Sequence, residues 1–330
     1  MKPSRRRASP ITELTRDARP LFWVSISVLL LVPLAFSMAV HRTFTLPKYA
    51  LLLAGSATLL GLLAVTLWSR AGDGRRMLGS THVAVIALYV GMIAISTAAG
   101  VAPRVALFGS FENQMGLVTR VCFLICCLSL IVGINHQWAR LRQALWVIAI
   151  TGLIVATYGF VQFFGHDPFL SPGLYTFDAA GGRIVRIIST LGHADYLGNF
   201  LLYTTPVSAA LALSHRGRAR LLALVAAALS ALVIVFSGTR GAMLGLIVAA
   251  LTFVLVVLKG KRALAWRGRR TRRGAAVAAL VVVAAIGLIV ANPASRQVVT
   301  RTRAAIAEGA SGAGRTLLWR DALPMLPAYG

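Results

Sequence analysis

The sequence predicts an all-α fold, a polytopic transmembrane helical bundle with its basic N-terminus in the cytoplasm and its C-terminus across the membrane. Of its 330 residues, 58% are hydrophobic and 13% are charged, a balance that would leave a soluble domain with large exposed apolar patches. Apolar runs of roughly 20 residues, the length of a membrane-spanning helix, recur along the chain with short basic segments between them. The surplus apolar surface is therefore expected to face lipid.

Nine apolar runs are long enough to be helical spans, although several are slightly shorter than the roughly 20 residues of a straight span. They are Leu21–Val40, Tyr49–Trp68, Val83–Ala99, Leu117–Ile134, Ala144–Phe164, Tyr196–Leu213, Leu221–Phe236, Ala242–Leu258 and Ala275–Ala291. The first run has no small-residue cleavage site after it, so it is predicted to be a span and not a cleaved signal peptide. The sequence thus predicts a basic terminus at 1–20, a membrane domain at 21–291 and the start of an outer loop at 292–330.

The distribution of basic residues predicts the orientation. When the connecting segments are assigned alternately to two sides, 22 of the 34 Lys and Arg residues lie on the side of the N-terminus and 12 lie on the other. Basic residues accumulate on the cytoplasmic side of membrane proteins, so the N-terminus is predicted to be cytoplasmic. The net charge of +25 does not indicate a nucleic-acid partner, because the basic residues fall between apolar runs and not on one folded face. The densest segment, 259–273, is interpreted as a basic loop that fixes orientation, with a nucleic-acid-binding or lipid-binding patch as the alternative.

The turn SGTRGAMLG, Ser237–Gly245, is the most informative outer segment. Arg240 opposes the basic bias there, and it lies at the N-terminus of the next helix, where the helix dipole disfavours a cation. A bound phosphate would compensate, because the helix N-terminus, the Ser237 and Thr239 hydroxyls and a guanidinium together favour an anion. The alternative is an Arg240 side chain that reaches lipid headgroup phosphates.

A second outer segment, GRIVRIISTLGHADYLGNF at 182–200, carries Arg183, Arg186, His193 and Asp195. Arg186 is the better candidate for binding an anion. His193 could act as a base or a metal ligand, but it lacks the spaced His or carboxylate partner of a metal site, and packing at the interface is the more ordinary role. No metal site is predicted.

A third segment, GRTLLWRDAL at 314–323, has the apolar spacing of a short amphipathic helix on the membrane surface. Arg315 would begin this helix, and Trp319 would lie at headgroup depth. Taken alone, the segment could be an interfacial anchor only.

In this order, SGTRGAMLG, GHADYLGN and GRTLLWRDAL resemble the O-antigen ligase and polymerase superfamily of bacterial membrane enzymes, which includes pilin-type oligosaccharide ligases. The segment FGSFENQMG, Phe108–Gly116, also resembles the family, so the likeness extends from about residue 100 to the end. The resemblance implies transfer of a glycan from a polyprenyl-pyrophosphate carrier to an acceptor hydroxyl of a lipid or protein. It places this chemistry on the periplasmic face of the bacterial inner membrane, without a nucleotide sugar, cofactor or metal, and it makes the C-terminus periplasmic.

The resemblance also implies roles for individual residues. Arg240 and Arg315 match the arginines expected to handle the donor pyrophosphate, where two guanidinium groups can neutralise the charge that builds on the leaving group. Arg183, Arg186, Thr239 and Trp319 are expected to contact substrate. The chain departs from the family at His193–Asp195, where members often have an Asn-rich stretch. The expected base, a His in the large periplasmic loop, has no match before Gly330, so the chain is expected to end inside that loop.

Two other functions are consistent with the sequence. Many spans and outer arginines also suit a secondary transporter of an anionic solute, but transporters usually place ionisable residues near the bilayer midplane, and these runs hold almost no charge. A non-enzymatic scaffold in envelope assembly is the third possibility.

Overall fold

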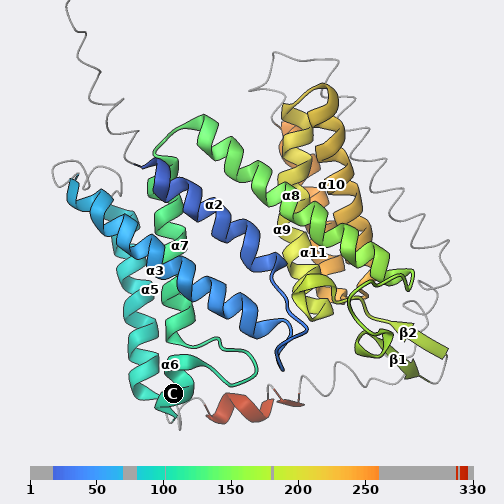
Figure 1. Ribbon diagram of the computed structural model, residues 1–330, viewed down its shortest axis with the longest axis horizontal. Coiled ribbons are helices and arrows are strands. Elements are labelled where there is room, and N and C mark those ends of the chain that lie inside the picture. The colour runs from blue at the N-terminus through green and yellow to red at the C-terminus, as the bar shows by residue number, and fades with distance from the viewer. Residues whose placement is uncertain are drawn as a thin grey trace, which may run out of the picture. The chain divides into compact units, whose positions relative to one another are not determined.

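The computed structural model describes residues 18–69, 80–100, 102–179, 182–259, 317–318 and 320–325. These residues form a helical structure with a single small hairpin among them (Figure 1). The elements, in chain order, are α2 (Arg19–Leu34), α3 (Thr45–Ser69), α5 (Ser80–Ala99), α6 (Pro103–Phe108), α7 (Leu117–Ile134), α8 (Trp138–Phe163), η1 (Pro172–Leu174), β1 (Thr176–Ala179), β2 (Gly182–Val185), η2 (Ser189–Leu191), α9 (Ala194–Ser214), α10 (Gly217–Phe236), α11 (Arg240–Lys259) and η4 (Leu323–Met325).

Each of the first eight predicted spans coincides with a helix, and the ninth, at 275–291, lies outside the described residues. Within the part of the chain that the structure describes, five helices are long and apolar enough to cross a bilayer: Thr45–Trp68, Leu117–Ile134, Trp138–Phe163, Ala194–Ser214 and Gly217–Phe236. Three shorter apolar helices, Arg19–Leu34, Ala84–Ala99 and Gly241–Phe253, accompany them. The chain is therefore a multi-pass membrane protein by the length and composition of its helices.

The predicted end of the first span is wrong. The run was expected to continue to Val40, but α2 ends at Leu34, and Ala35 already has an extended backbone. Pro33 lies in the last turn, where its ring removes an N–H donor from the helix. With 16 residues, α2 is about 24 Å long, which is less than the hydrocarbon thickness of a bilayer.

The chain divides into two compact units. The first consists of Met1–Ala144 with Trp319–Gly330, and the second of Leu145–Leu318. In the first unit α2, α3 and α7 pack around a core of Leu21, Leu59, Leu63 and Val132. Phe22 and Gly133 approach so closely that a Cβ on the glycine would lie 2.9 Å from the Phe22 Cα.

A buried arginine closes one end of this three-helix core. Arg140 is only 7% exposed, and its Nη1 donates to the carbonyl of Gly133 at 2.6 Å. Its guanidinium also lies 5.7 Å from the ring centre of Phe22. A cation at the C-terminus of α7 is favoured by the helix dipole, so Arg140 joins α7 to α2 at this end.

Also in the first unit, the loop at 108–116 contacts the connection between α2 and α3. The Arg42 guanidinium lies over the ring of Phe111, 3.7 Å from its centre, and Nη1 donates to the Phe111 carbonyl. The loop at 108–116 is thus held by a cation–π contact and a hydrogen bond.

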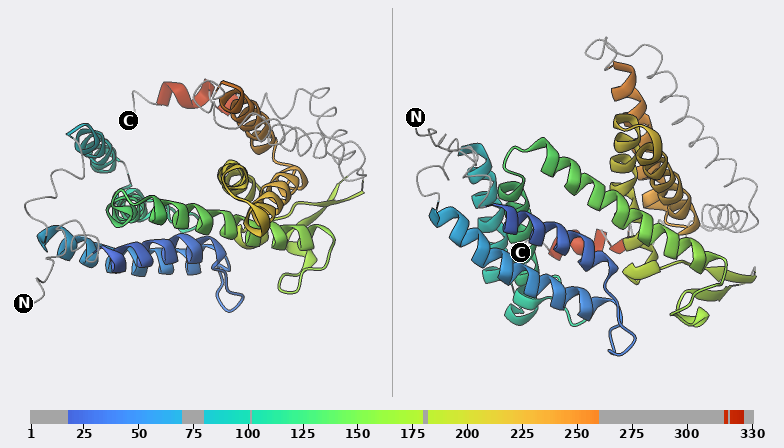
Figure 2. Two further views of the ribbon diagram at one scale, coloured as in Figure 1. Left: turned by 90° about the horizontal axis from the view of Figure 1, so that it is seen from above. Right: turned by 45° about the horizontal axis from the view of Figure 1, so that its top comes forward.

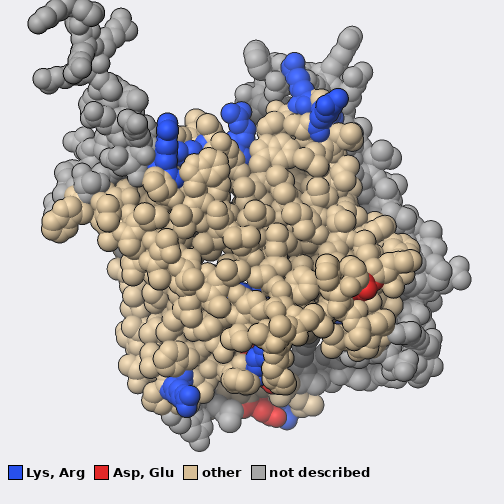
Figure 3. Space-filling model, in the orientation of Figure 1, with Lys and Arg blue, Asp and Glu red and all other residues tan. Residues whose placement is uncertain are grey.

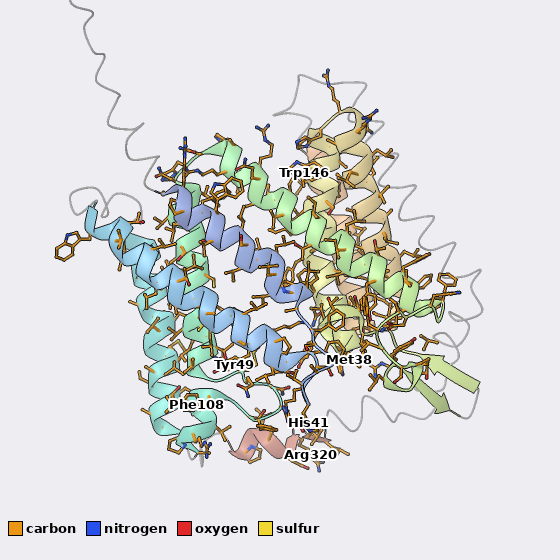
Figure 4. All side chains as sticks on the ribbon, in the orientation of Figure 1. Met38, His41, Tyr49, Phe108, Trp146 and Arg320 are labelled. Carbon is orange, nitrogen blue, oxygen red and sulfur yellow. The ribbon has the colours of Figure 1, made fainter. Side chains whose placement is uncertain are left out.

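In the second unit α10 packs along α9, and α11 packs on the same helix. The core between α8, α9 and α10 contains Ala149, Leu211, Ala212 and Ala223. Trp146 lies at the end of this core near the α9–α10 turn, where its Nε1 donates to His215 Nε2 at 3.4 Å (Figure 4). The exposed Arg216 and Arg218 belong to the same turn, and blue side chains gather there in Figure 3, above a largely uncharged helical surface.

The hairpin was not predicted. Strands β1 and β2 are antiparallel, with Thr176 opposite Val185 and Ala179 opposite Gly182. The hairpin projects beyond the C-terminal end of α8 (Figures 1 and 2). It therefore lies at the opposite end of the second unit from the basic turn, and it leads directly to Arg186.

Candidate functional site

The candidate site begins where α10 ends. Phe236, the last residue of α10, stacks on Phe163 of α8 with ring centres 4.1 Å apart, and this contact fixes the end of α10 against the end of α8. The Ser237 hydroxyl donates to the carbonyl of Ile234 at 2.7 Å and accepts the Thr239 N–H at 3.3 Å. Gly238 has φ of +67°, a conformation that favours glycine. The chain can then turn sharply into α11 at Arg240.

The turn at Ser237–Thr239 touches the start of α9. A Cβ placed on Gly198 would lie 2.7 Å from the Ala242 Cβ and 3.4 Å from the Thr239 Cβ, so a larger residue would separate α9 from the turn. Thr239 is 8% exposed, and its hydroxyl lies 3.2 Å from both the Ala194 carbonyl and the Asp195 Oδ1. A hydroxyl has one hydrogen to donate, so these two oxygens share it.

Asp195 connects two of the outer segments that the sequence singled out. Its Oδ1 accepts from Thr239 and lies 3.5 Å from Nη2 of Arg186. The Arg186 side chain is 42% exposed and that of Asp195 46% exposed, so this ion pair is open to solvent or headgroups. The structure therefore brings the segment 182–200 and the turn 237–241 together through one carboxylate.

His193 has a local structural role at this point. Its Nδ1 accepts the backbone N–H of Asp195 at 3.1 Å, which caps the N-terminus of α9. The same nitrogen lies 3.8 Å from Asp195 Oδ2, which is too long for a hydrogen bond. The ring packs beside Tyr196 with centres 5.3 Å apart. This position fits the packing role that the sequence favoured.

Gln162 of α8 holds the segment between Arg186 and His193. The Gln162 side chain is fully buried, and its Oε1 accepts the N–H groups of Ile188 and Ser189, both at 2.8 Å. Ser189 has φ of +49°, and its hydroxyl donates to the carbonyl of Val155 at 2.8 Å. A non-glycine residue in this conformation needs support from its surroundings, and these three hydrogen bonds provide it.

Asp167 holds the other side of Gln162. Its Oδ2 accepts from the Gln162 amide at 2.7 Å, and its Oδ1 accepts from the Tyr158 hydroxyl at 2.9 Å. Burial alone would raise the pKa of Asp167, but the N–H groups of Leu170 and Phe169 together with these two side chains stabilise the carboxylate, and the pKa is lowered overall. The carboxylate therefore ties the loop after α8 to the helix.

The structure describes some of the site residues that the sequence predicted and not others. Arg186 and Thr239 both contact Oδ1 of Asp195. Arg240 is the first residue of α11, and Arg183 is in β2 opposite Asp178, but the side chains of these two arginines are not among those described. Arg315 and Trp319 lie outside the described residues.

Sequence reasoning missed Gln162 and Asp167 and gave Asp195 no role. The signal for Gln162 was its amide, in a run at 144–164 whose other residues are apolar or carry only a hydroxyl. Among the described residues, no group of three His, Cys, Asp or Glu side chains is placed to hold a metal ion.

The chain was compared with known protein families. Residues 225–329 match the O-antigen ligase family. The match covers about the last third of the chain and includes the turn with Thr239 and Arg240, whereas Arg186 and Asp195 precede it. The O-antigen ligase match confirms the resemblance that the sequence motifs indicated.

Comparisons of the chain with curated proteins and with solved structures gave no match.

Proposed function

We propose that the protein transfers a glycan from a polyprenyl-pyrophosphate carrier to an acceptor hydroxyl, as O-antigen ligases and polymerases do. The proposal rests on one structural observation together with the family match. Asp195 contacts both Arg186 and Thr239, so the arginine that we expect to bind an anion, Arg186, lies close to the turn that begins α11 with Arg240. The O-antigen ligase match covers that turn.

The chemistry demands positive charge at this place. The acceptor oxygen attacks the anomeric carbon, the bond from that carbon to the pyrophosphate oxygen breaks, and the acceptor proton passes to a base. Negative charge accumulates on the departing pyrophosphate, and guanidinium groups bind such oxygens in pairs. Arg240 and Arg315 would stabilise the leaving group, and Arg183 and Arg186 would bind the donor. Thr239 and Trp319 would contact substrate, Trp319 at headgroup depth, and Thr239 would also support the turn.

We infer the orientation from the basic-residue count, which predicts that the turn 237–241 is on the non-cytoplasmic side. The likeness to O-antigen ligases suggests that this side is the periplasmic face of the bacterial inner membrane. The geometry of α10 is consistent with this assignment. The basic turn with Arg216 and Arg218 is at one end of α10, and Thr239 follows the other end. A helix of 20 residues is about 30 Å long, which is the thickness of the hydrocarbon core.

Replacement of Arg240 tests the proposal. In the complete protein, Arg240→Ala should insert normally and lose transfer from a lipid-linked donor by at least about a hundredfold, because a charge-stabilising group of the leaving phosphate is removed. Arg240→Lys should also be impaired, because an ammonium keeps the charge but lacks the planar fork. The matched control is Arg218→Ala, which removes a guanidinium from the other end of α10. Full activity of Arg240→Lys would show that the residue only anchors the helix at the headgroups.

The pair Arg240 and Arg315 provides a second test. If both bind one pyrophosphate, the loss of either misplaces the phosphate that the other must hold, and the two losses should not add. A double-mutant cycle on transfer rate, with each arginine changed to Ala singly and together, measures this coupling. Strict additivity would leave Arg315 as an interfacial anchor.

A further inference from the structure

We propose that Asp195 is a positioning residue of the donor site, holding the Arg186 guanidinium and the N-terminus of α11 in one arrangement. Its meaning for catalysis rests on the proposed function, in which Arg186 and the α11 turn face the donor pyrophosphate. Asp195 itself does not touch the donor, and it acts through Arg186 and Thr239.

The first step of the argument is that Asp195 is a fixed point. It lies in the first turn of α9, where the helix dipole favours a carboxylate, and its own N–H donates to His193. Its neighbours Ala194 and Leu197 are buried, at 2% and 0% exposed, which anchors the backbone. Thr239, 8% exposed, donates to Oδ1 from the other segment. The carboxylate therefore has little freedom to move.

The second step is that Arg186 has a fixed backbone and a long side chain. Its N–H donates to the carbonyl of Tyr175 at 2.7 Å, and the next two residues, Ile187 and Ile188, are buried. The side chain then extends to a surface where it is 42% exposed. A flexible arginine loses rotamer freedom when it binds an anion, and a nearby carboxylate can limit that freedom in advance.

The third step concerns the geometry of the contact. Oδ1 of Asp195 lies 3.5 Å from one terminal nitrogen of Arg186, Nη2. A guanidinium carries five N–H donors in a planar fork, so a contact at one corner leaves the other edge able to bind a phosphate. The ion pair thus orients the fork without occupying it.

Stability does not account for the contact. Both side chains are nearly half exposed, and exposed ion pairs contribute little to folding. A carboxylate beside an anion site also weakens the attraction for the anion. Its presence here is explained if the gain from an oriented guanidinium exceeds that loss.

The first arm of the test measures the position of Arg186 directly and needs no donor. The protein in nanodiscs is treated with phenylglyoxal, which modifies guanidinium groups, and the modification rate of Arg186 is followed by peptide mass spectrometry. Asp195→Asn keeps an oxygen for Thr239 but removes the charge, and it should raise the rate at Arg186 about threefold, the factor expected for an exposed ion pair. Arg218 in the same sample should react at an unchanged rate. An unchanged rate at Arg186 would overturn the proposal.

The second arm asks whether the arrangement serves the donor. In the complete protein, Asp195→Asn should raise KM for a polyprenyl-pyrophosphate-linked glycan about fivefold, the cost of ordering one long side chain, and leave kcat nearly unchanged. In an Arg186→Ala background, the same substitution should have no further effect on KM. Glu112→Gln, which removes an exposed carboxylate from the other unit, is the control.

A KM that is unchanged or lower in Asp195→Asn would overturn the positioning role, as would an equal rise in the Arg186→Ala background. A complete lack of transfer in the unmodified protein would count against the proposed function instead. The phenylglyoxal rates would still decide whether Asp195 holds Arg186.

Discussion

Replacement of Gln162 by leucine is the sharpest test of how the site is built. Leucine has a similar volume, so the change removes hydrogen bonds and leaves the packing of α8 nearly intact. The buried N–H groups of Ile188 and Ser189 both lose their acceptor, and Asp167 loses one donor. An unsatisfied buried donor costs about 1–3 kcal/mol, so the two N–H groups together imply about 2–6 kcal/mol.

The loss should appear as local opening of the segment 186–192 before the helices separate, because Ser189 needs its hydrogen bonds to keep a positive φ. Hydrogen exchange of the peptides that cover this segment, in detergent or nanodiscs, measures the opening. A loss of about 3 kcal/mol corresponds to an exchange rate more than a hundredfold faster. Gln143→Leu is the matched control, since Gln143 is exposed on the same helix.

The reasoning would be refuted if Gln162→Leu left the protection of 186–192 unchanged, or if Gln143→Leu accelerated exchange there equally. A second variant separates the two roles of the Gln162 amide, which accepts two backbone N–H groups through its oxygen and donates to Asp167 through its nitrogen. Gln162→Glu keeps acceptors for both N–H groups but puts a second carboxyl oxygen where a donor now lies 2.7 Å from Asp167. In Gln162→Glu the two facing carboxylates should repel and weaken the hydrogen-exchange protection of residues 186–192 at neutral pH. At low pH one of the two carboxyl groups is protonated, and the protection of this segment should return.

Three further outcomes are expected. Gly152→Ala should lower the stability by about 1–3 kcal/mol in a thermal unfolding assay, because a Cβ would lie 2.6 Å from an α9 side chain, whereas Gly61→Ala meets nothing within 4 Å and should not. The pKa of Asp167 lies below its ordinary value of 3.8, so the carboxylate contributes its full stabilisation above pH 3.8 and loses it as the pH falls through the lowered pKa. Asp167→Asn should therefore reduce the dependence of the unfolding free energy on pH in this acidic range. In a protein without its native cysteines, a cysteine at Gly241 should react only with reagent from the periplasmic side and one at Arg218 only from the cytoplasmic side; the reverse pattern would disprove the orientation.

The positions of the helices could be predicted because lipid imposes a simple rule on sequence. A spanning helix must satisfy its backbone internally and expose apolar side chains, so runs such as 117–134 reveal their helices without knowledge of any neighbour. The end of α2 was missed because the apolar run continues past Pro33, and hydropathy does not register the missing N–H. The hairpin at 176–185 was missed because its strands are only four residues long.

The sequence indicated the charged residues of the candidate site but not the residues that support them. Arg240 drew attention because a cation on the outer side opposes the basic bias, which is visible in a single sequence, and Arg186 was the better anion candidate in its outer segment. The roles of Gln162 and Asp195 depend on contacts between residues 26 and 44 positions apart, and no local pattern encodes such contacts. Thr239 was expected at the phosphate, and the sequence did not predict that its hydroxyl hydrogen is shared between Ala194 and Asp195, which also holds two segments together.

The cap on α9 determines which tautomer His193 adopts. Because Nδ1 receives the N–H of Asp195, its lone pair is engaged, and in the neutral ring the hydrogen resides on Nε2. The imidazole therefore presents a donor to its surroundings, suited to a phosphate oxygen and unsuited to taking a proton from an alcohol. A general base must offer a free lone pair, which Nδ1 of His193 does not while it caps α9.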